Sequence, residues 1–569
     1  MREIEITGRL DLASFYQRRI KRLLPSSLFV LAVTAFLAYF LLPAIGRDSL
    51  ARDLFAAATY ISNYLFAWWE NDYQNLNATP SPFIHYWSLA VEEQFYLIWP
   101  LLMLYLARGG RRKIFIGIFS LTAFSLALSI YQVQTAPIWA FYSLPTRAWE
   151  LGVGALLLFL PQRLHRNRAL PWLGFLALLF AAFNYNDNTA FPGLNAVTPV
   201  IATALLIATI SYWPPIFNDL FNNAISQWLG KISYPLYLWH WPALVLPSSA
   251  MGRSLSLIER IGAIALTVIL AQLTNKYIED PLRYRQFNPR TLYRYAVATT
   301  TGSIALSVVI ALTSSSMITT KGPNPISFDL LEVIAKPNIY ADQCHINYGS
   351  RKQGLCIYGK EDSTITIVLY GDSHAAQWFP ALDEMARARG FRLISLTKSA
   401  CAAVEAPRPD QGAFKEAHCK KWREESIARI KDLAPRAIIT SSFAHFNLRA
   451  NYPDRRSWWR DGQKKLLLHL DPNRQPIIYI SDTPKPLLDI PSCLATRLAH
   501  KCDNSERTPV NIIPGFKTID PTTWLCARTC PAIVNSIVAY RDASHISVNM
   551  ARHLRAQLER ELQANGLFA

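Results

Sequence analysis

The fold of the second half of the chain is decided by the stretch Thr364-Ile365-Thr366-Ile367-Val368-Leu369-Tyr370-Gly371-Asp372-Ser373-His374. Its β-branched and apolar residues run up to a glycine, which predicts a buried parallel strand that ends in a tight turn. Residues 375–389, which follow the turn, have helical periodicity. A serine on a sharp turn between a strand and a helix is exposed as a nucleophile. With further strands predicted at residues 437–442 and 476–481, we expect an α/β/α sandwich.

A second motif, far downstream, supplies partners for that serine. Asp542-Ala543-Ser544-His545 holds a carboxylate and an imidazole three residues apart, so one helical turn or tight loop keeps both near one point. A serine hydroxyl is a weak nucleophile until a base takes its proton. Ser373 would carry the acyl group, His545 would be the base and Asp542 would orient it. The backbone N–H of Ser373 is one expected oxyanion donor, and we interpret His374 as structural.

The cysteines indicate where this half of the chain resides. All of them lie after residue 340, namely Cys344, Cys356, Cys401, Cys419, Cys493, Cys502, Cys526 and Cys530. An even number confined to the polar part of a chain indicates disulfides in an oxidising compartment. Sequential pairing, 344–356, 401–419, 493–502 and 526–530, is the simplest connectivity. Zinc is the alternative, but no spacing gives paired CxxC knuckles, and we predict no metal site.

Composition indicates a membrane protein. Hydrophobic residues make up 51% of the 569 residues and charged residues 17%, with a formal net charge of +18. Such a charge is typical of proteins that bind nucleic acid or an anionic membrane surface. Here the cations gather in short clusters between apolar runs, as at residues 18–22 and 111–113. This is the positive-inside pattern of integral membrane proteins, so we expect the lipid bilayer as a partner and no nucleic acid.

Apolar runs long enough to cross a bilayer occur at residues 24–43, 87–107, 113–133, 146–160, 170–184, 195–212, 232–247, 260–280 and 295–313. If residues 18–22 are cytoplasmic, alternation of these spans leaves the cysteine-bearing domain outside. Residues 50–69 would invert every later loop as a full span, so we interpret them as a re-entrant or interfacial segment on the outer face. The expected domains are a membrane domain over 1–290, an additional span over 291–315, a linker over 316–343 and an outer domain over 344–569.

Several polar residues lie inside these spans, where ionisable groups are functional candidates by default. Glu92 begins one span next to a second carboxylate, and Glu150 lies three residues after Arg147 on one helical face. His240 lies near an expected outer boundary, and Glu279 near an inner one. We predict Glu92 and Glu150 as acyl-transfer residues of the membrane half. Interhelical salt bridges and interfacial aromatic belts are the alternatives for these motifs.

Four strings resemble the acyltransferase 3 family of membrane acyltransferases: Phe15-Tyr16-Gln17-Arg18-Arg19-Ile20-Lys21-Arg22-Leu23-Leu24-Pro25, Trp87-Ser88-Leu89-Ala90-Val91-Glu92-Glu93-Gln94-Phe95-Tyr96, Arg147-Ala148-Trp149-Glu150-Leu151-Gly152 and Ser233-Tyr234-Pro235-Leu236-Tyr237-Leu238-Trp239-His240. The domain with the Gly-Asp-Ser-His and Asp-Ala-Ser-His motifs resembles the flavodoxin-like SGNH domain fused to a subset of that family. The resemblance implies O-acetylation of an extracytoplasmic glycan such as O-antigen, other surface polysaccharide or peptidoglycan.

The same resemblance implies cytoplasmic acetyl-CoA as the acyl donor, with no tightly bound cofactor, and a multi-pass protein of a bacterial inner membrane whose C-terminal domain is periplasmic or extracellular. Arg18, Arg19 and Arg22 would meet the phosphates of the donor. Members of the family begin with two further spans, the first carrying an Arg and a His that act on the donor. This chain begins at the loop before the third span, so we expect a start site set too late, with a truncated membrane half as the alternative.

Two other functions share these features. A glycan O-acetyl esterase would use the same Ser373, His545 and Asp542 with water as the acceptor. An inactive or transport-only remnant would keep the fold without the chemistry. The membrane half is what favours transfer over hydrolysis.

Overall fold

The computed structural model describes residues 11–42, 46–70, 80–186, 189–251, 255–314, 316–322, 325–347, 353–354, 356–406, 412–444, 455–470, 475–504 and 512–567. The chain forms two compact units, the first ending at residue 314 and the second beginning at residue 315. Each unit is described by itself.

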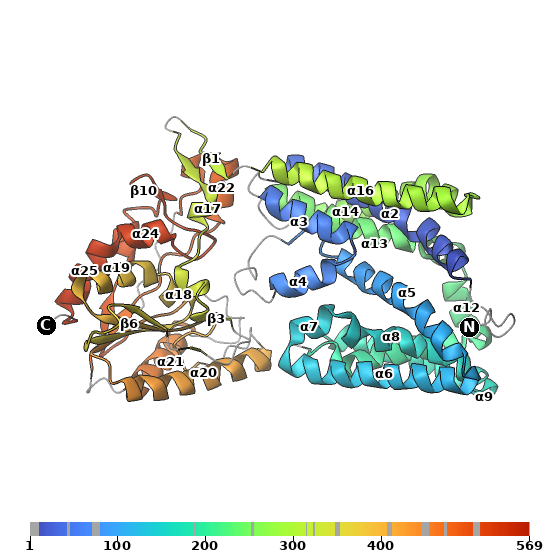
Figure 1. The fold of residues 1–569 in the computed structure, drawn as a ribbon, viewed down its shortest axis with the longest axis horizontal. Coiled ribbons are helices and arrows are strands. Elements are labelled where there is room, and N and C mark those ends of the chain that lie inside the picture. Colours follow the sequence, from blue (N-terminus) through green and yellow to red (C-terminus); the bar gives the residue numbers. More distant parts are fainter. Residues whose placement is uncertain are drawn as a thin grey trace. The chain divides into compact units, whose positions relative to one another are not determined.

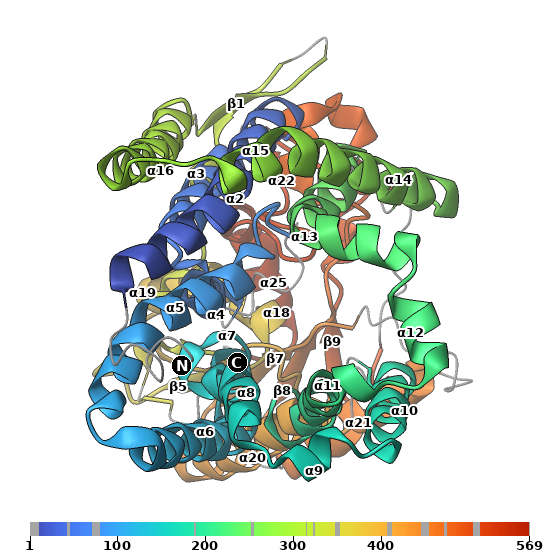
Figure 2. The same cartoon turned by 90° about the vertical axis from the view of Figure 1, so that its right-hand side faces the viewer.

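The described part of the first unit is helical (Figure 1). Its helices are α2 Leu12–Leu41, α3 Arg47–Ala58, α4 Ser62–Glu70, α5 Tyr86–Ala107, α6 Gly110–Thr135, α7 Pro137–Tyr142, α8 Leu144–Leu156, α9 Gln162–His165, α10 Ala169–Asn184, α11 Val197–Ala208, α12 Pro215–Phe221, α13 Ala224–Met251, α14 Leu257–Thr274, α15 Asp280–Tyr284 and α16 Pro289–Leu312. Helices α2, α3, α13, α14 and α16 form one group and α6, α8, α10 and α11 another, with α4 and α5 between them (Figure 2).

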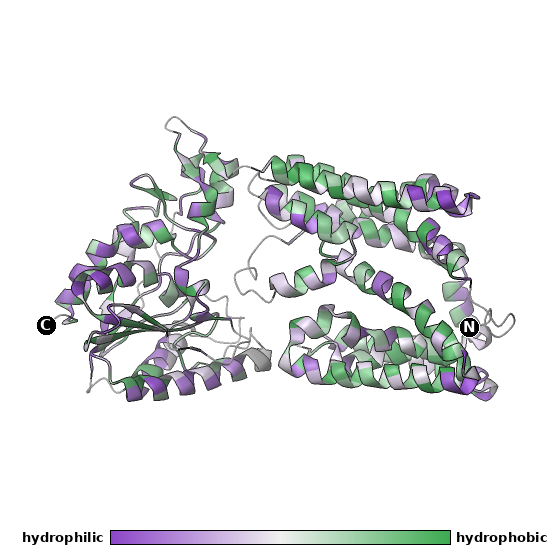
Figure 3. Cartoon of the chain, in the orientation of Figure 1, coloured by the Kyte–Doolittle hydropathy of each residue, from purple (hydrophilic) through white to green (hydrophobic). Residues whose placement is uncertain are grey.

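These helices present apolar side chains outward as well as inward. Figure 3 shows them as mostly hydrophobic along their lengths, and Phe124 and Phe183 are 67% and 84% exposed. Five helices in the described residues are long and apolar enough to cross a membrane: Leu12–Leu41, Tyr86–Ala107, Gly110–Thr135, Leu257–Tyr284 and Pro289–Leu312. A helix that is apolar all round needs lipid or a large core around it. The first unit is therefore a membrane domain.

The predicted spans coincide with helices of this unit, and the short ones at 146–160 and 170–184 correspond to α8 and α10. Residues 50–69 form parts of two helices, α3 and α4, separated by a break at Thr59–Ile61, where Tyr60 has φ +55°. At about 1.5 Å of rise per residue, neither helix can cross a bilayer alone. Their re-entrant position on the outer face stays a prediction.

The second unit is built on a seven-stranded sheet. Its strands are β3 His345–Ile346, β4 Ile357–Gly359, β5 Thr366–Gly371, β6 Arg392–Lys398, β7 Ala437–Ser441, β8 Ile477–Ile480 and β9 Lys517–Ile519. They lie in the order β3-β6-β5-β7-β8-β9 with parallel neighbours, and β4 pairs antiparallel with β6. The predicted strands at 364–370, 437–442 and 476–481 correspond to β5, β7 and β8. Strand β6 has no counterpart in the sequence prediction.

Helices cover both faces of this sheet, so the α/β/α fold class is confirmed. Helices α19 Phe379–Arg389, α24 Val548–His553 and α25 Arg555–Ala564 lie over one face, and α20 Gly412–Leu433 and α21 Arg455–His469 over the other (Figure 1). Every residue of β5 is buried. Ile367 and Leu369 belong to the core on the α19 side, and Val368 and Tyr370 to the core on the α20 side. The alternation of a strand thus divides its side chains between two cores.

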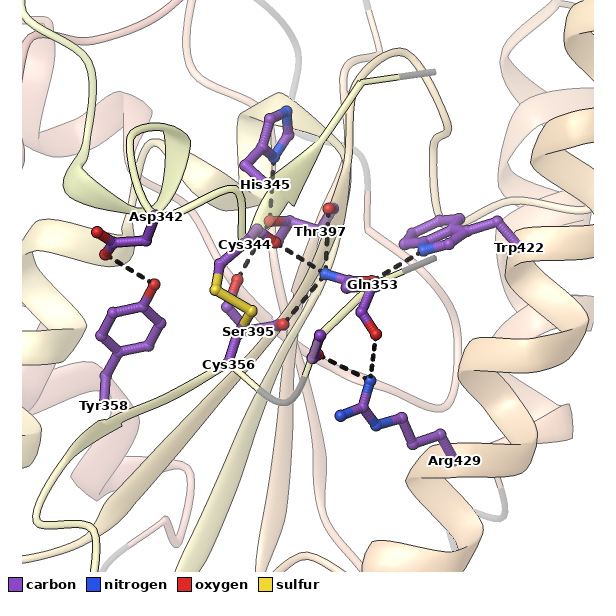
Figure 4. The surroundings of a disulfide bond; sticks show 11 residues. Asp342, Cys344, His345, Gln353, Cys356, Tyr358, Ser395, Thr397, Trp422 and Arg429 are labelled. Atoms are coloured by element: carbon purple, nitrogen blue, oxygen red, sulfur yellow. Dashed lines mark hydrogen bonds between the residues drawn. A yellow bond between two sulfur atoms is a disulfide. The ribbon is translucent and has the colours of Figure 1, made fainter. Parts of the chain in front are cut away.

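The eight cysteines form four disulfides with the predicted sequential pairing: Cys344–Cys356, Cys401–Cys419, Cys493–Cys502 and Cys526–Cys530. Figure 4 shows the first of them beside Gln353. The Gln353 amide donates to the carbonyl oxygens of Cys344 and Ser395 at 2.8 and 3.2 Å and accepts from the Trp422 indole at 3.1 Å. This side chain therefore ties the disulfide loop to β6 and to α20.

Candidate active site

The turn after β5 fixes the position of Ser373. Gly371 has φ +147°, and a Cβ there would lie 2.1 Å from the carbonyl oxygen of Ser441 on β7, so only glycine fits this close approach. Asp372 then accepts the backbone N–H of His374 at 2.8 Å and that of Phe443 at 3.0 Å. Ser373 is the first residue of the short helix α18, Ser373–Ala376. The turn before it contacts the end of β7 twice, through the close approach of Gly371 to Ser441 and through the hydrogen bond from Phe443 to Asp372.

A continuous hydrogen-bond chain runs from Ser373 to Asp542. The Ser373 hydroxyl donates to Nε2 of His545 at 2.8 Å, and Nδ1–H of His545 donates to Oδ2 of Asp542 at 2.8 Å. Oδ1 of Asp542 accepts the backbone N–H groups of Ser544 and His545 at 2.7 Å each. One carboxylate therefore shapes its own loop with one oxygen and sets the tautomer of the imidazole with the other.

Burial determines the protonation of this chain. Ser373 is 0% and His545 5% exposed. Desolvation lowers the pKa of His545 to about 4, with the Asp542 carboxylate opposing it. Desolvation would raise the pKa of Asp542, but His545 and Arg541 hold it below its usual value. At neutral pH a neutral imidazole thus faces the serine and a carboxylate faces the imidazole, which is the state that a general base requires.

Two backbone N–H groups in the loop after β7 already donate hydrogen bonds to carboxylates, so they are not available as oxyanion donors. Phe443 donates to Asp372 and Ala444 donates to Oδ2 of Asp482 at 2.7 Å. The Ser442 hydroxyl accepts from the backbone of Ala403 at 2.9 Å. The N–H groups of Phe443 and Ala444 are therefore occupied, and the role of the Ser373 backbone N–H as an oxyanion donor stays a prediction.

The membrane domain has a small pocket of about 220 Å³ with polar groups in its lining. Arg19 and Tyr16 of α2, Tyr60, and Glu93 and Tyr96 of α5 contribute to it. The guanidinium carbon of Arg19 lies 4.0 Å from the centroid of the Tyr96 ring. The pocket thus holds one cation and one carboxylate between two helices.

The other polar motifs of the membrane domain form pairs. Nε of Arg147 lies 2.7 Å from Oε1 of Glu150, and Nζ of Lys231 lies 2.6 Å from Asp280. The His240 ring lies 5.6 Å, centroid to centroid, from the buried His85, whose Nε2 hydrogen-bonds the carbonyl oxygen of Leu238 at 3.0 Å. The Lys231–Asp280 pair joins α13 to α15 and is an interhelical salt bridge of the kind that the sequence left open, whereas Arg147 and Glu150 pair within α8.

Comparison with known proteins gives the domain families. Residues 5–276 match the family model of an acyltransferase domain, and residues 343–560 match that of an SGNH domain fused to AT3 domains. The chain belongs to the acyltransferase 3 proteins with a fused SGNH domain. Residues 5–276 are accordingly called the acyltransferase domain, and residues 343–560 the SGNH domain.

Relatives are similar over part of their length. Peptidoglycan O-acetyltransferase OatA of Listeria monocytogenes is 32% identical over 49% of this chain and 47% of the relative. YrhL of Bacillus subtilis is 31% identical over 49% of this chain and 48% of the relative. The chain thus spans about half the length of these relatives. The periplasmic domain of a lipopolysaccharide acetyltransferase of Salmonella ser. Paratyphi A is 14% identical, covering 36% of this chain and 86% of that chain, with a TM-score of 0.29.

In the SGNH domain, the residues predicted from the sequence, Ser373, His545 and Asp542, lie together, and their catalytic roles stay predictions. Two neighbours were missed. Asp482 follows β8 and hydrogen-bonds His374, and Gln377 accepts the backbone N–H of Ile546 at 3.0 Å. Each is an ordinary polar residue in the sequence, and only the fold brings it to the site.

In the acyltransferase domain the prediction and the pocket overlap in part. Arg19 lines the pocket, whereas Arg18 and Arg22 are exposed. Glu93 lines it rather than Glu92. Glu150 is not among the lining residues and is paired with Arg147. The adjacent carboxylates could not be told apart without knowing which face of α5 packs against α2.

Proposed function

We propose that this chain is a membrane O-acetyltransferase that moves acetyl from cytoplasmic acetyl-CoA to hydroxyls of an extracytoplasmic glycan, such as O-antigen, other surface polysaccharide or peptidoglycan. The observation that carries the proposal is the hydrogen-bonded chain Ser373–His545–Asp542 in an SGNH domain that follows an acyltransferase domain. The names of the relatives support a glycan as the acceptor class.

The proposed chemistry in the SGNH domain has two steps. In the first, Ser373 Oγ attacks the acetyl carbonyl carbon, its proton passes to Nε2 of His545, and the leaving group of the donor takes that proton as its bond to the acetyl group breaks. In the second, His545 takes the proton of a sugar hydroxyl while the sugar oxygen attacks the acyl-enzyme. The Ser373–acetyl bond breaks and His545 returns the proton to Oγ. Asp542 stabilises the imidazolium formed in each step.

The acyltransferase domain would supply the acetyl group. Arg18, Arg19 and Arg22 would bind the phosphates of acetyl-CoA, because guanidinium groups recognise phosphate in a bidentate way. Arg19 is the best supported of the three, since it lines the 220 Å³ pocket together with Glu93. Glu92 and Glu150 remain candidates for passing the acyl group outward, and Glu93 joins them as a third.

The proposed location is a bacterial inner membrane with the SGNH domain on the periplasmic or extracellular side. Four disulfides support an oxidising environment for that domain. The helices of the acyltransferase domain support a multi-pass membrane protein.

The test is mass analysis of surface glycan from cells that carry the chain, its Ser373→Ala variant or an empty vector. The chain is expressed as given and with any in-frame upstream extension. Ester-linked acetyl that appears with the intact serine and disappears in Ser373→Ala would support the proposal. Loss of acetyl already present would identify an esterase, and no change in either form would overturn both activities.

A further inference from the structure

A second histidine–aspartate pair lies against the base of the candidate active site. His374, which follows the nucleophile, is 1% exposed, and its Nδ1–H donates to Oδ1 of Asp482 at 2.6 Å. The centroid of its ring lies 4.5 Å from that of His545, at an interplanar angle of 37°. Asp482 is itself held by the backbone N–H groups of Ala444 and Thr483, at 2.7 and 2.9 Å. Two imidazoles therefore lie against each other at a tilt beside the serine, each hydrogen-bonded to its own carboxylate.

The bonding of His374 differs from that of a purely structural histidine in the same domain. His345 is also buried, and it uses both ring nitrogens, on the hydroxyls of Thr397 and Ser399 at 3.0 and 2.9 Å. In His374 one nitrogen is on a carboxylate, and Nε2 has no hydrogen-bond partner among the described residues. A double-ended tie explains the burial of His345. It does not explain the burial of His374, which is tied at one ring nitrogen alone and whose ring lies against those of His545 and Phe443.

The surroundings of the two imidazoles favour opposite charge states. Burial disfavours the charged form of His374, but the carboxylates of Asp482, Asp372 and Asp542 outweigh it and raise its pKa above the usual value. Burial lowers the pKa of His545, and the positive charges of His374 and Arg541 lower it further, against the pull of Asp542. For His345, burial with Arg541, His545 and Lys336 holds the pKa well below the usual value, so this third imidazole is neutral.

We propose that His374, held by Asp482, is a positioning residue of the acyl-transfer site: its imidazole lies against that of His545, and in the protonated form that Asp482 favours it keeps this base in its neutral, proton-accepting form. The inference rests on the proposed function, because it assumes that His545 activates Ser373. A positive charge next to His545 opposes its protonation, so the base stays available at lower pH. The same charge makes the transient imidazolium of His545 a stronger acid, which speeds return of the proton to the leaving oxygen.

The test is the pH dependence of Ser373 labelling by a fluorophosphonate probe, in membranes that contain the full chain. Phosphonylation needs an activated serine but neither acetyl donor nor glycan, so it separates this inference from the transferase proposal. The variants are His374→Gln and Asp482→Asn, which remove the charge or its partner with little change in volume. The matched control is His345→Gln, which removes a buried imidazole that carries no charge.

In the wild type we expect labelling to fall as the pH drops through about 4. In His374→Gln and in Asp482→Asn the acid limb should move to higher pH by about one unit or more, because two charges at this separation interact strongly in a buried site. In His345→Gln the acid limb should not move.

Lower labelling at all pH values with an unmoved acid limb in both test variants would overturn the inference and assign His374 a packing role. A wild type whose labelling does not depend on Ser373 would overturn the inference and the proposed function together, whereas a moved limb in a chain that acetylates no glycan would overturn the transferase alone.

Discussion

Replacing Asp542 by asparagine should reverse the tautomer of His545 while keeping the loop that carries it. The two backbone bonds to Oδ1, at 2.7 Å each, can be kept by the amide oxygen. The amide NH₂ then takes the place of Oδ2, which accepts Nδ1–H of His545 at 2.8 Å. Since NH₂ only donates, Nδ1 must accept, and the ring proton moves to Nε2. That nitrogen then presents N–H to Ser373 and cannot take its proton.

The size of the loss distinguishes this reasoning from a weaker effect. Removing one hydrogen bond to a charged group costs about 1.5–3 kcal/mol, or roughly ten- to hundredfold in rate. The Asp542 side chain is 33% exposed, so solvent screening places that contribution at the lower end. Reversal of the tautomer removes the base altogether and should lower the rate by about 10³–10⁴-fold. A measured loss of labelling rate above a thousandfold is therefore too large for one hydrogen bond and requires reversal of the His545 tautomer.

The assay is the rate of Ser373 labelling by a fluorophosphonate at pH 7, with the unfolding midpoint of each variant measured in parallel. Ser544→Ala is the matched control, because its hydroxyl contacts both His545 Nδ1 and Asp542 Oδ1, at 3.1 and 3.3 Å, without setting the tautomer. It should stay within about threefold of the wild type. A folded Asp542→Asn protein that loses less than tenfold would refute the assignment of Asp542 as the residue that orients the base.

Three further predictions follow from other parts of the structure. Gly371→Ala puts a Cβ 2.1 Å from a carbonyl oxygen of β7 and should destabilise the SGNH domain by about 3 kcal/mol or more in chemical unfolding; Gly390→Ala, whose Cβ would meet nothing closer than 3.7 Å, should cost only about 1 kcal/mol. Because burial lowers the pKa of His545 to about 4, hydrolysis of 4-nitrophenyl acetate should be constant from pH 7 down to about 5 and fall below that as the imidazole is protonated; an acid limb near pH 6.5 would contradict this burial effect. Arg19→Ala should abolish glycan acetylation, measured by mass analysis, while leaving Ser373 labelling unchanged, and equal loss of both would mean that the substitution damages folding.

Local sequence features predicted the parts of the structure that depend on few residues. The apolar run before Gly371 predicted β5 and its turn, because a buried parallel strand has a composition of its own. Sequential pairing predicted all four disulfides, whose partners are 4 to 18 residues apart. The spacing in Asp542–His545 sufficed to predict one loop, and the structure shows that the aspartate itself shapes that loop.

Features that depend on tertiary packing were missed. Strand β6 carries Ser395, Thr397 and Lys398, which are all buried, and such polar residues weaken the apolar pattern by which a strand is recognised. Asp482 is 108 residues away from His374 in the sequence, and no local signal connects the two. Glu92 and Glu93 differ by one step around a helix, and only the packing of α5 decides that Glu93 lines the pocket.

The same physics explains why the site forms where it does. The carboxyl ends of parallel strands meet at one edge of a sheet, and this edge gathers loops whose backbone groups have no ladder partner. Asp372 after β5 and Asp482 after β8 take up the N–H groups of Phe443 and Ala444 after β7. Each carboxylate thus joins its own loop to the loop of the strand beside it. Asp482 also accepts a hydrogen bond from the His374 imidazole. The carboxylate that joins the loops after β7 and β8 is therefore also the one that favours a positive charge on His374, next to His545. Asp482→Asn should therefore affect both the unfolding midpoint and the acid limb, whereas His374→Gln should move the acid limb with the smaller effect on unfolding.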